Sequence, residues 1–121
     1  MDAPDICTDP QAPRMDPLLS RRCQPMEGGA PLADDDVSRA LAQLPGWSVV
    51  DGMLHKRYGF ADFHRTMAFV NAVAWIAHRE DHHPDLLVVY NACTVRLATH
   101  SVGGLSINDF ICAAKVDALL D

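Results

Sequence analysis

The sequence predicts an α+β fold: a single antiparallel four-stranded sheet with three helices packed on one face, in the order α-β-β-α-β-β-α. Asp51-Gly52 separates two runs of β-forming residues, and this dipeptide favours the positive φ angles of a two-residue hairpin turn. Residues 86–90 and 93–99 have the composition of a second strand pair. Between the pairs, residues 62–79 carry an apolar stripe at helical spacing, which predicts the central helix.

The first helix is predicted to begin at Asp34, because three successive aspartates favour the positive end of a helix dipole. The apolar residues that follow at helical spacing are Val37, Ala40, Leu41 and Leu44. Pro45-Gly46 should end this helix.

In the first strand pair, pairing of Val50 with Met53 puts mainly apolar residues on one face of the hairpin. They are Trp47, Val49, Leu54, Tyr58 and Phe60, with Lys56 as the exception. In the second pair, Val95 and Leu97 alternate with polar or small residues, and the turn is expected at Asn91-Ala92. The opposite face of the sheet, which no helix covers, favours self-association.

The other two helices have predictable ends. The central helix must end by His83, since the ring of Pro84 drives the preceding residue out of the α region. The last helix is expected to start at Ser106, which forms a capping box with Asp109.

Length and composition restrict the class of protein. The chain has 121 residues, which favours one domain, and six of its eight prolines precede residue 32. Residues 1–30 are therefore predicted to be a disordered or weakly ordered tail, and residues 31–121 the folded domain. The net charge of -6 argues against nucleic acid as a partner.

Location and redox state follow from the same composition. No apolar run approaches the roughly 20 residues that span a membrane, and the N-terminus is acidic, so a cytoplasmic protein without a membrane partner is expected. The cysteines are scattered at positions 7, 23, 93 and 112, which favours reduced thiols over a disulfide framework.

Three of the six histidines come directly after predicted elements of the fold, namely the central helix and the last strand. His82 and His83 lie in the turn after the central helix, and His100 follows the last strand. The unperturbed pKa of histidine, about 6.5, lets it donate or accept a proton at neutral pH. If the two stretches meet at one cavity, they predict acid-base catalysis.

The run His78-x-x-x-His82-His83-Pro84, followed by Tyr90, His100 and Asp109, resembles the motif of the pterin-4a-carbinolamine dehydratases. Other stretches that resemble bacterial members are Leu44-Pro45-Gly46-Trp47, Asp62-Phe63, Phe69-Val70-Asn71, Thr99-His100, Gly103-Gly104-Leu105 and Asn108-Asp109-Phe110. Residues 23–29 resemble the N-terminal lead-in of these proteins. The resemblance extends over about residues 18–119.

The resemblance implies a hydro-lyase that dehydrates 4a-hydroxytetrahydropterin, the 4a-carbinolamine, to quinonoid dihydropterin. This reaction recycles tetrahydrobiopterin after an aromatic amino acid hydroxylase has used it. It requires neither a metal nor a redox cofactor, and the family suggests a homodimer or homotetramer. His82 and His100 correspond to the acid and the base, in either order, and His83 orients the pterin and shares in catalysis. The other implied substrate-binding residues are His78, Asp81, Pro84, Thr99 and Asp109.

The chain departs from the family pattern around the pterin. His78 stands where many members have glutamate, Leu86 where vertebrate members have tryptophan, and Ala98 where they have serine. In the lead-in, Met26 replaces a cysteine that is common among relatives, which leaves Cys23 as a free thiol.

Two alternatives stay open. His78 and His82 are four residues apart, which puts both imidazoles on one helical face, and His83 or His100 with Asp81 could complete a zinc site. The second alternative is a non-catalytic protein-interaction module on the same scaffold, since animal relatives act as dimerisation cofactors of a transcription factor.

Overall fold

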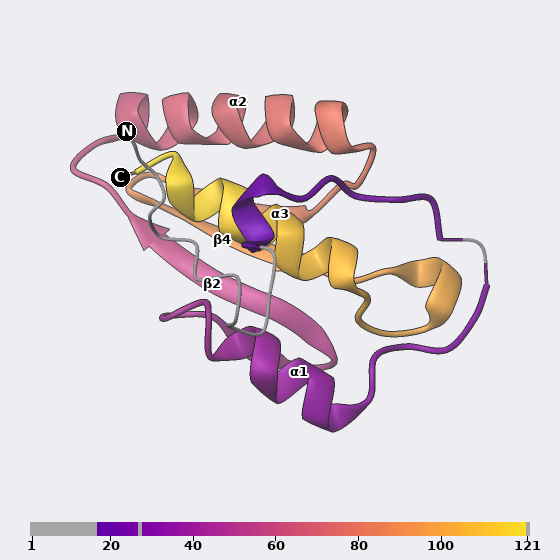
Figure 1. The fold of residues 1–121 in the computed structure, drawn as a ribbon. Coiled ribbons are helices and arrows are strands. Elements are labelled where there is room, and N and C mark those ends of the chain that lie inside the picture. Colours follow the sequence, from indigo (N-terminus) through magenta and orange to yellow (C-terminus); the bar gives the residue numbers. More distant parts are fainter. Residues whose placement is uncertain (1–16, 27, 121) are drawn as a thin grey trace, which may run out of the picture.

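The computed structural model describes residues 17–26 and 28–120 of the chain. Within these residues, three α-helices lie on one face of a four-stranded antiparallel sheet (Figure 1). The helices are α1 (Asp34–Leu41), α2 (Phe63–Glu80) and α3 (Ile107–Ala118), and the strands are β1 (Ser48–Val50), β2 (Met53–Gly59), β3 (Asp85–Val89) and β4 (Ala92–Leu97). The predicted class and the order α-β-β-α-β-β-α are confirmed.

The sheet joins two hairpins side by side in the strand order β1-β2-β4-β3. The first hairpin turns at Asp51 and Gly52, whose φ angles of 52° and 77° are those of the predicted two-residue turn. The central strands β2 and β4 pair from Leu54 with Leu97 to Gly59 with Ala92. The inner faces of these two strands therefore form the floor on which the helices pack.

The second hairpin turns one residue earlier than predicted. Val89 pairs with Ala92, so the turn is Tyr90-Asn91 rather than Asn91-Ala92. The carbonyl of Tyr90 accepts a hydrogen bond from Thr66 Oγ1 at 3.0 Å, and that of Asn91 accepts one from Phe60 N at 2.7 Å. These contacts with distant residues fix the turn, and no local pattern could show them.

The core lies between the sheet and the helices. Its fully buried side chains of largest volume come from the central strands and from α2 and α3, and include Leu54, Val73, Val95, Leu97, Phe110, Ile111 and Val116. Lys56, the polar exception on the predicted face, pairs with Asp117 of α3 at 2.9 Å. Val49, on the edge strand β1, keeps 40% of its surface exposed although it was assigned to the same face.

Part of the N-terminal region packs against the domain. Leu18, in the short 3-10 helix η2 (Leu18–Ser20), is 5% exposed and belongs to the core cluster, and the ammonium group of Lys115 on α3 donates to the Leu19 carbonyl at 2.8 Å. Residues 17–26 were predicted to be part of a weakly ordered tail, yet they contact α2 and α3. Residues 1–16 lie outside the described part, so the domain boundary at residue 30 stays a prediction.

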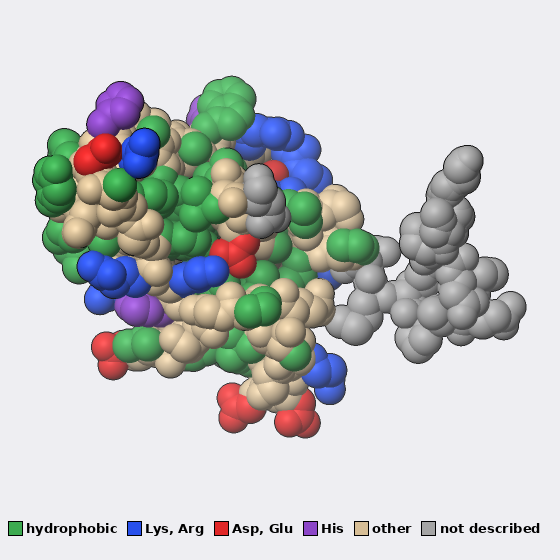
Figure 2. All heavy atoms as spheres, turned by 90° about the vertical axis from the view of Figure 1, so that its left-hand side faces the viewer, with side chains coloured by type: hydrophobic (Ala, Val, Ile, Leu, Met, Phe, Trp, Pro, Cys, Tyr) green, Lys and Arg blue, Asp and Glu red, His purple; other side chains and the backbone are tan. Residues whose placement is uncertain are grey.

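Hydrophobic side chains also reach the surface. Figure 2 shows them on the end of the molecule where α2 begins and α3 ends. The exposed large side chains near these helix ends are Phe63, Tyr90, Leu119 and Leu120, and the rings of Phe63 and Tyr90 stack at 6.3 Å.

Over the described residues, no helix combines the length and the apolar character that a membrane span requires.

Candidate active site

The first wall of the site is the sharp turn after α2. The helix begins at its cap Asp62, whose side chain accepts a hydrogen bond from Arg65 N at 2.8 Å. It ends at Asp81, which has a left-handed backbone with φ 51°, and the amide of His82 returns to the Ala77 carbonyl at 3.2 Å. This helix end, together with Pro84, makes the chain turn toward β3 and presents His82 and His83 beside the start of α3.

The second wall is the loop between β4 and α3. The loop closes on itself because Thr99 N donates to the Gly104 carbonyl at 2.8 Å, and the short 3-10 helix η3 (His100–Val102) fills the bend. Gly103 has a φ of 72°, which favours glycine, and a Cβ atom on Gly104 would lie 2.9 Å from Pro31 Cβ. The closed loop returns the chain to Ser106 and thereby brings Thr99 next to the first turn of α3.

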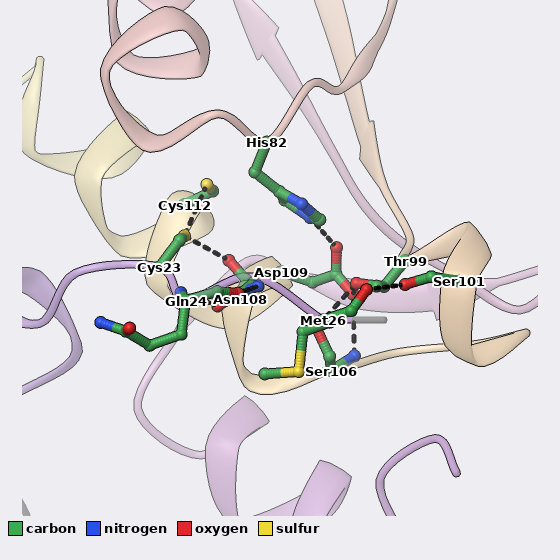
Figure 3. A network of polar contacts seen from close by, with 10 residues as sticks. All are labelled: Cys23, Gln24, Met26, His82, Thr99, Ser101, Ser106, Asn108, Asp109 and Cys112. Atoms are coloured by element: carbon green, nitrogen blue, oxygen red, sulfur yellow. Dashed lines mark hydrogen bonds and ion pairs between the residues drawn. The ribbon is translucent and has the colours of Figure 1, made fainter. Parts of the chain in front are cut away.

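Asp109 is the centre of a buried network at this point (Figure 3). Its side chain is fully buried, and His82 Nε2 lies 2.6 Å from Asp109 Oδ1. The other oxygen, Oδ2, accepts hydrogen bonds from Thr99 Oγ1 at 2.8 Å and from the Ser106 amide at 2.9 Å. The second of these is the predicted capping-box contact, so Asp109 caps α3 and also holds the histidine.

The contact with Asp109 favours one tautomer of His82. A carboxylate accepts hydrogen bonds, so the ring pairs with Asp109 by donating from Nε2. His82 Nδ1 is then the nitrogen that can take up or release a proton while the ring stays anchored through Nε2. The buried carboxylate thus sets the tautomer and the orientation of an imidazole that is still 12% exposed.

All three predicted catalytic histidines border one pocket of about 600 Å³, a volume within the usual range for small-molecule sites. Its lining residues come from α2 and the turn after it, from the loop after β4, from the first turn of α3, and from the N-terminal segment. The condition for acid-base chemistry, namely that His100 shares a cavity with His82 and His83, is met by this arrangement.

The third wall is an N-terminal segment, residues 22–26, which we call the strap. The amide of Cys23 donates to Glu80 Oε1 at 2.8 Å, and Gln24 and Asn108 exchange two hydrogen bonds, of 3.0 and 2.7 Å. The Met26 carbonyl accepts a hydrogen bond from Ser101 Oγ. The strap therefore connects α2, α3 and the loop after β4 along one side of the pocket.

Glu80 is the anchor of the strap on α2. Its side chain is 2% exposed and pairs with Arg22 at 3.0 Å. Burial alone would raise the pKa of Glu80, but the Cys23 amide and the positive charges of Lys115 and Arg22 outweigh burial and hold this pKa below its ordinary value. Glu80 is thus an ionised carboxylate whose contacts go to the strap.

The remaining predicted site residues occupy different places. Asp81 and Thr99 line the same pocket as the histidines, whereas Asp109 lies beneath His82 and Pro84 borders a separate small cavity. The exposed ring of His78 lies 5.8 Å from the ring of Trp75, and His78 is not among the described residues that line the 600 Å³ pocket.

Sequence reasoning missed most of the strap side of the pocket. The lining residues without a predicted role are Cys23, Gln24, Pro25, Met26, Arg79, Glu80, Ser101 and Asn108. The proline-rich composition placed residues 23–26 in a tail, although their resemblance to the lead-in of bacterial family members was a signal that they belong with the domain.

The described residues provide no cluster of ligands for the alternative of a zinc site. Among the described residues, no group of three or more histidine, cysteine, aspartate or glutamate side chains is arranged to hold a metal ion. His82 directs Nε2 to Asp109, and His78 lies beside Trp75.

The fold and the site define an α+β protein with a histidine-lined pocket at the junction of a helix end and a sheet end. Residues 30–119 match the family described as Pterin 4 alpha carbinolamine dehydratase. The chain belongs to this family.

Curated relatives and solved structures agree with the family assignment. Two relatives carry the name "Putative pterin-4-alpha-carbinolamine dehydratase": one from Chromobacterium violaceum is 56% identical over 84% of this chain and 94% of its own, and one from Nitrosospira multiformis is 51% identical over 87% of this chain and 94% of its own. A crystal structure titled as a transcriptional coactivator/pterin dehydratase from Brucella melitensis has a TM-score of 0.72 and 33% identity, covering 75% of this chain and 99% of that one. A structure titled as a pterin dehydratase-like protein that is a RuBisCO assembly factor in the alpha-carboxysome has a TM-score of 0.50 and 27% identity, covering 60% of this chain and 84% of that one.

Proposed function

We propose that this protein dehydrates 4a-hydroxytetrahydropterin to quinonoid dihydropterin and water by histidine acid-base catalysis. The observation that carries the proposal is that His82, His83 and His100 border one pocket, in which His82 is anchored by the buried carboxylate of Asp109. Family membership supplies the substrate class.

The reaction is an elimination. It requires two proton transfers, and no electrons pass to or from an outside acceptor. The C4a hydroxyl leaves as water after it receives a proton from an imidazolium. The N5 proton passes to a neutral imidazole as the C4a=N5 double bond forms. His82 and His100 take these two roles, and each well-placed acid or base contributes about 10² to 10⁴-fold in rate.

His82 is suited to such a role because its anchor does not depend on its charge. Asp109 can accept a hydrogen bond from Nε2–H whether Nδ1 is protonated or not, so the ring can exchange its Nδ1 proton without reorienting. His83 would orient the pterin and share in catalysis, while Asp81 and Thr99 would contact the ring system from the pocket wall.

The test is a turnover assay with single-histidine variants. The 4a-carbinolamine is generated enzymatically by an aromatic amino acid hydroxylase, and water loss is followed by ultraviolet absorbance. We expect His82→Ala and His100→Ala to lower kcat on the order of 10² to 10⁴-fold. His64→Ala is the matched control, because His64 is exposed on α2 and does not line the pocket. A wild-type protein that does not accelerate water loss over buffer would overturn the proposal.

A protein-interaction role is the second candidate, favoured by the printed titles of the two solved relatives, which name a transcriptional coactivator and an assembly factor. The two candidates respond differently to the same variants. In cells that depend on the protein, His82→Ala and His100→Ala should abolish its contribution if the role is catalytic, and should leave it intact if the scaffold alone acts.

The proposed setting is the cytoplasm, with a functional link to an aromatic amino acid hydroxylase that produces the substrate. We also propose a homodimer or homotetramer, because the edge strand β3 exposes Leu87 by 58% and Val89 by 47% on the face that no helix of the described residues covers. Light scattering coupled to gel filtration measures the assembly, and a monomer at micromolar concentration would contradict it.

A further inference from the structure

Two cysteines lie beside the pocket and take no part in the hydrogen bonds of Asp109 with His82 (Figure 3). Cys23 of the strap and Cys112 of α3 are free thiols, and their Sγ atoms lie 3.6 Å apart. The two residues are 89 positions apart in the chain, so the fold alone brings them together. Cys23 is partly exposed, whereas Cys112 is 2% exposed.

We propose that Cys23 and Cys112 are an oxidant-sensitive thiol pair whose disulfide fastens the strap to α3 at the wall of the pocket. A disulfide bond is about 2.05 Å long, so the sulfurs must approach each other by roughly 1.5 Å. Cys112 is held within a helix, while Cys23 lies outside any helix or strand. Cys23 can therefore make most of this movement.

The chemistry is balanced with hydrogen peroxide as the oxidant. The Cys23 sulfur attacks one peroxide oxygen, the O–O bond breaks, and the products are a sulfenic acid on Cys23 and one water molecule. The Cys112 sulfur then attacks the Cys23 sulfur, the S–O bond breaks, and the hydroxyl leaves as a second water with the Cys112 proton. The exposures set this order, because the oxidant reaches Cys23 and not Cys112.

The surroundings of Cys112 affect the second step. The hydrogen bond with Cys23, burial, and the nearby negative charges of Glu80 and Asp109 raise the pKa of Cys112 far above its ordinary value. Because the thiolate is the attacking form, closure of the disulfide should become faster as the pH rises.

The disulfide would act on the backbone of the strap. The amides of Cys23 and Gln24 donate to side chains of α2 and α3, at 2.8 and 3.0 Å, so they exchange with solvent only when the strap lifts from the domain. A covalent link at Cys23 removes the lifted state. The pocket wall would then be mobile in the reduced protein and fixed in the oxidised protein.

The experiment uses the full chain with Cys7→Ser, which removes a competing thiol from residues outside the described part. After peroxide treatment, peptide mapping with and without reductant should recover Cys23 linked to Cys112. Hydrogen exchange at the amides of Cys23 and Gln24 should slow at least about tenfold and recover on reduction. Neither readout depends on turnover, so the result is independent of the proposed reaction.

Three variants sharpen the experiment. Cys23→Ser and Cys112→Ala should each abolish the linked peptide and the slower exchange, while Cys93→Ala, which alters a buried thiol on β4, should preserve both. Oxidation of Cys23 to a sulfinic acid without a linked peptide, a link between Cys23 and any other cysteine, or unchanged exchange in the linked protein would each overturn the proposal.

Discussion

The two ends of α3 carry the same residue type in two different settings. Asp117, in the last turn, accepts hydrogen bonds from Lys56 Nζ at 2.9 Å and from Tyr58 Oη, both on β2. Asp109, in the first turn, accepts from the Ser106 amide, from Thr99 and from His82. Each carboxylate connects the helix to residues distant in sequence.

The difference lies in what the carboxylate holds. Lys56 carries a permanent charge near neutral pH, and the Asp117 side chain is 25% exposed, so this end is a structural link between helix and sheet. The fully buried Asp109 holds an imidazole that can change its protonation state at the edge of a pocket. The two carboxylates of α3 thus differ in burial and in the kind of partner that each one holds.

The largest expected contrast is in activity. Asp109→Asn replaces one accepting oxygen by an NH₂ group, which would face a donor in the network and favour the other tautomer of His82. We expect kcat for pterin dehydration to fall on the order of 10² to 10⁴-fold, and Asp117→Asn to change it by less than about threefold. Steady-state kinetics on both variants measures the contrast.

The pH profile of Asp109→Asn separates positioning from a general loss of structure. A positioning role predicts a changed pH dependence of kcat with an unchanged circular dichroism spectrum. Equal losses of activity in the two variants would contradict the distinction between the two ends of α3.

The second contrast is in stability. Asp109→Ala leaves the Ser106 amide, the Thr99 hydroxyl and His82 Nε2 without their acceptor in a buried place, at a cost of about 3 kcal/mol. The Asp117 side chain is 25% exposed, so water can replace the lost carboxylate beside Lys56 and Tyr58, and Asp117→Ala should cost about 1 kcal/mol. Urea unfolding at neutral pH measures both values, and a larger loss for Asp117→Ala would reverse the comparison.

The sequence was informative wherever local chemistry decides the structure. The turn at Asp51-Gly52, the end of α2 before Pro84 and the capping box of Ser106 with Asp109 were all predictable, because each depends on residues close together in the chain. The histidines could be assigned to one site because the order of elements brings the end of α2 and the end of β4 to the same place.

What the sequence did not reveal depends on contacts between distant residues. The proline-rich composition gave no indication of the strap. Its position depends on hydrogen bonds to Glu80 and Asn108 rather than on its own structural propensity. From the sequence, Lys56 was an unexplained exception on an apolar face. The structure explains it by the ion pair of Lys56 with Asp117. His78 was assigned to the site by motif alone; its ring lies beside Trp75, and its role stays a prediction.

The smallest contrast is in the response to alkaline pH. Burial, followed by the hydrogen bond to Asp117 and the negative charge of that residue, raises the pKa of Tyr58 well above its ordinary value near 10. A group whose pKa is higher in the folded state contributes stability that is complete below its unfolded pKa and declines as the pH rises above it. Wild-type protein should therefore lose about 1 kcal/mol between pH 9 and pH 11 through Tyr58 alone.

Tyr58→Phe isolates this contribution, because the variant keeps the ring and the Lys56–Asp117 pair but has no phenol to ionise. Its free energy of unfolding should fall less steeply over the same pH interval, when both proteins are unfolded with urea at each pH. Asp109→Asn supplies the comparison at the other end of α3, and its alkaline slope should match that of the wild type. Parallel slopes for Tyr58→Phe and the wild type would mean that the phenol ionises as readily in the folded protein as in the unfolded chain, and that the link at Asp117 does not shield it.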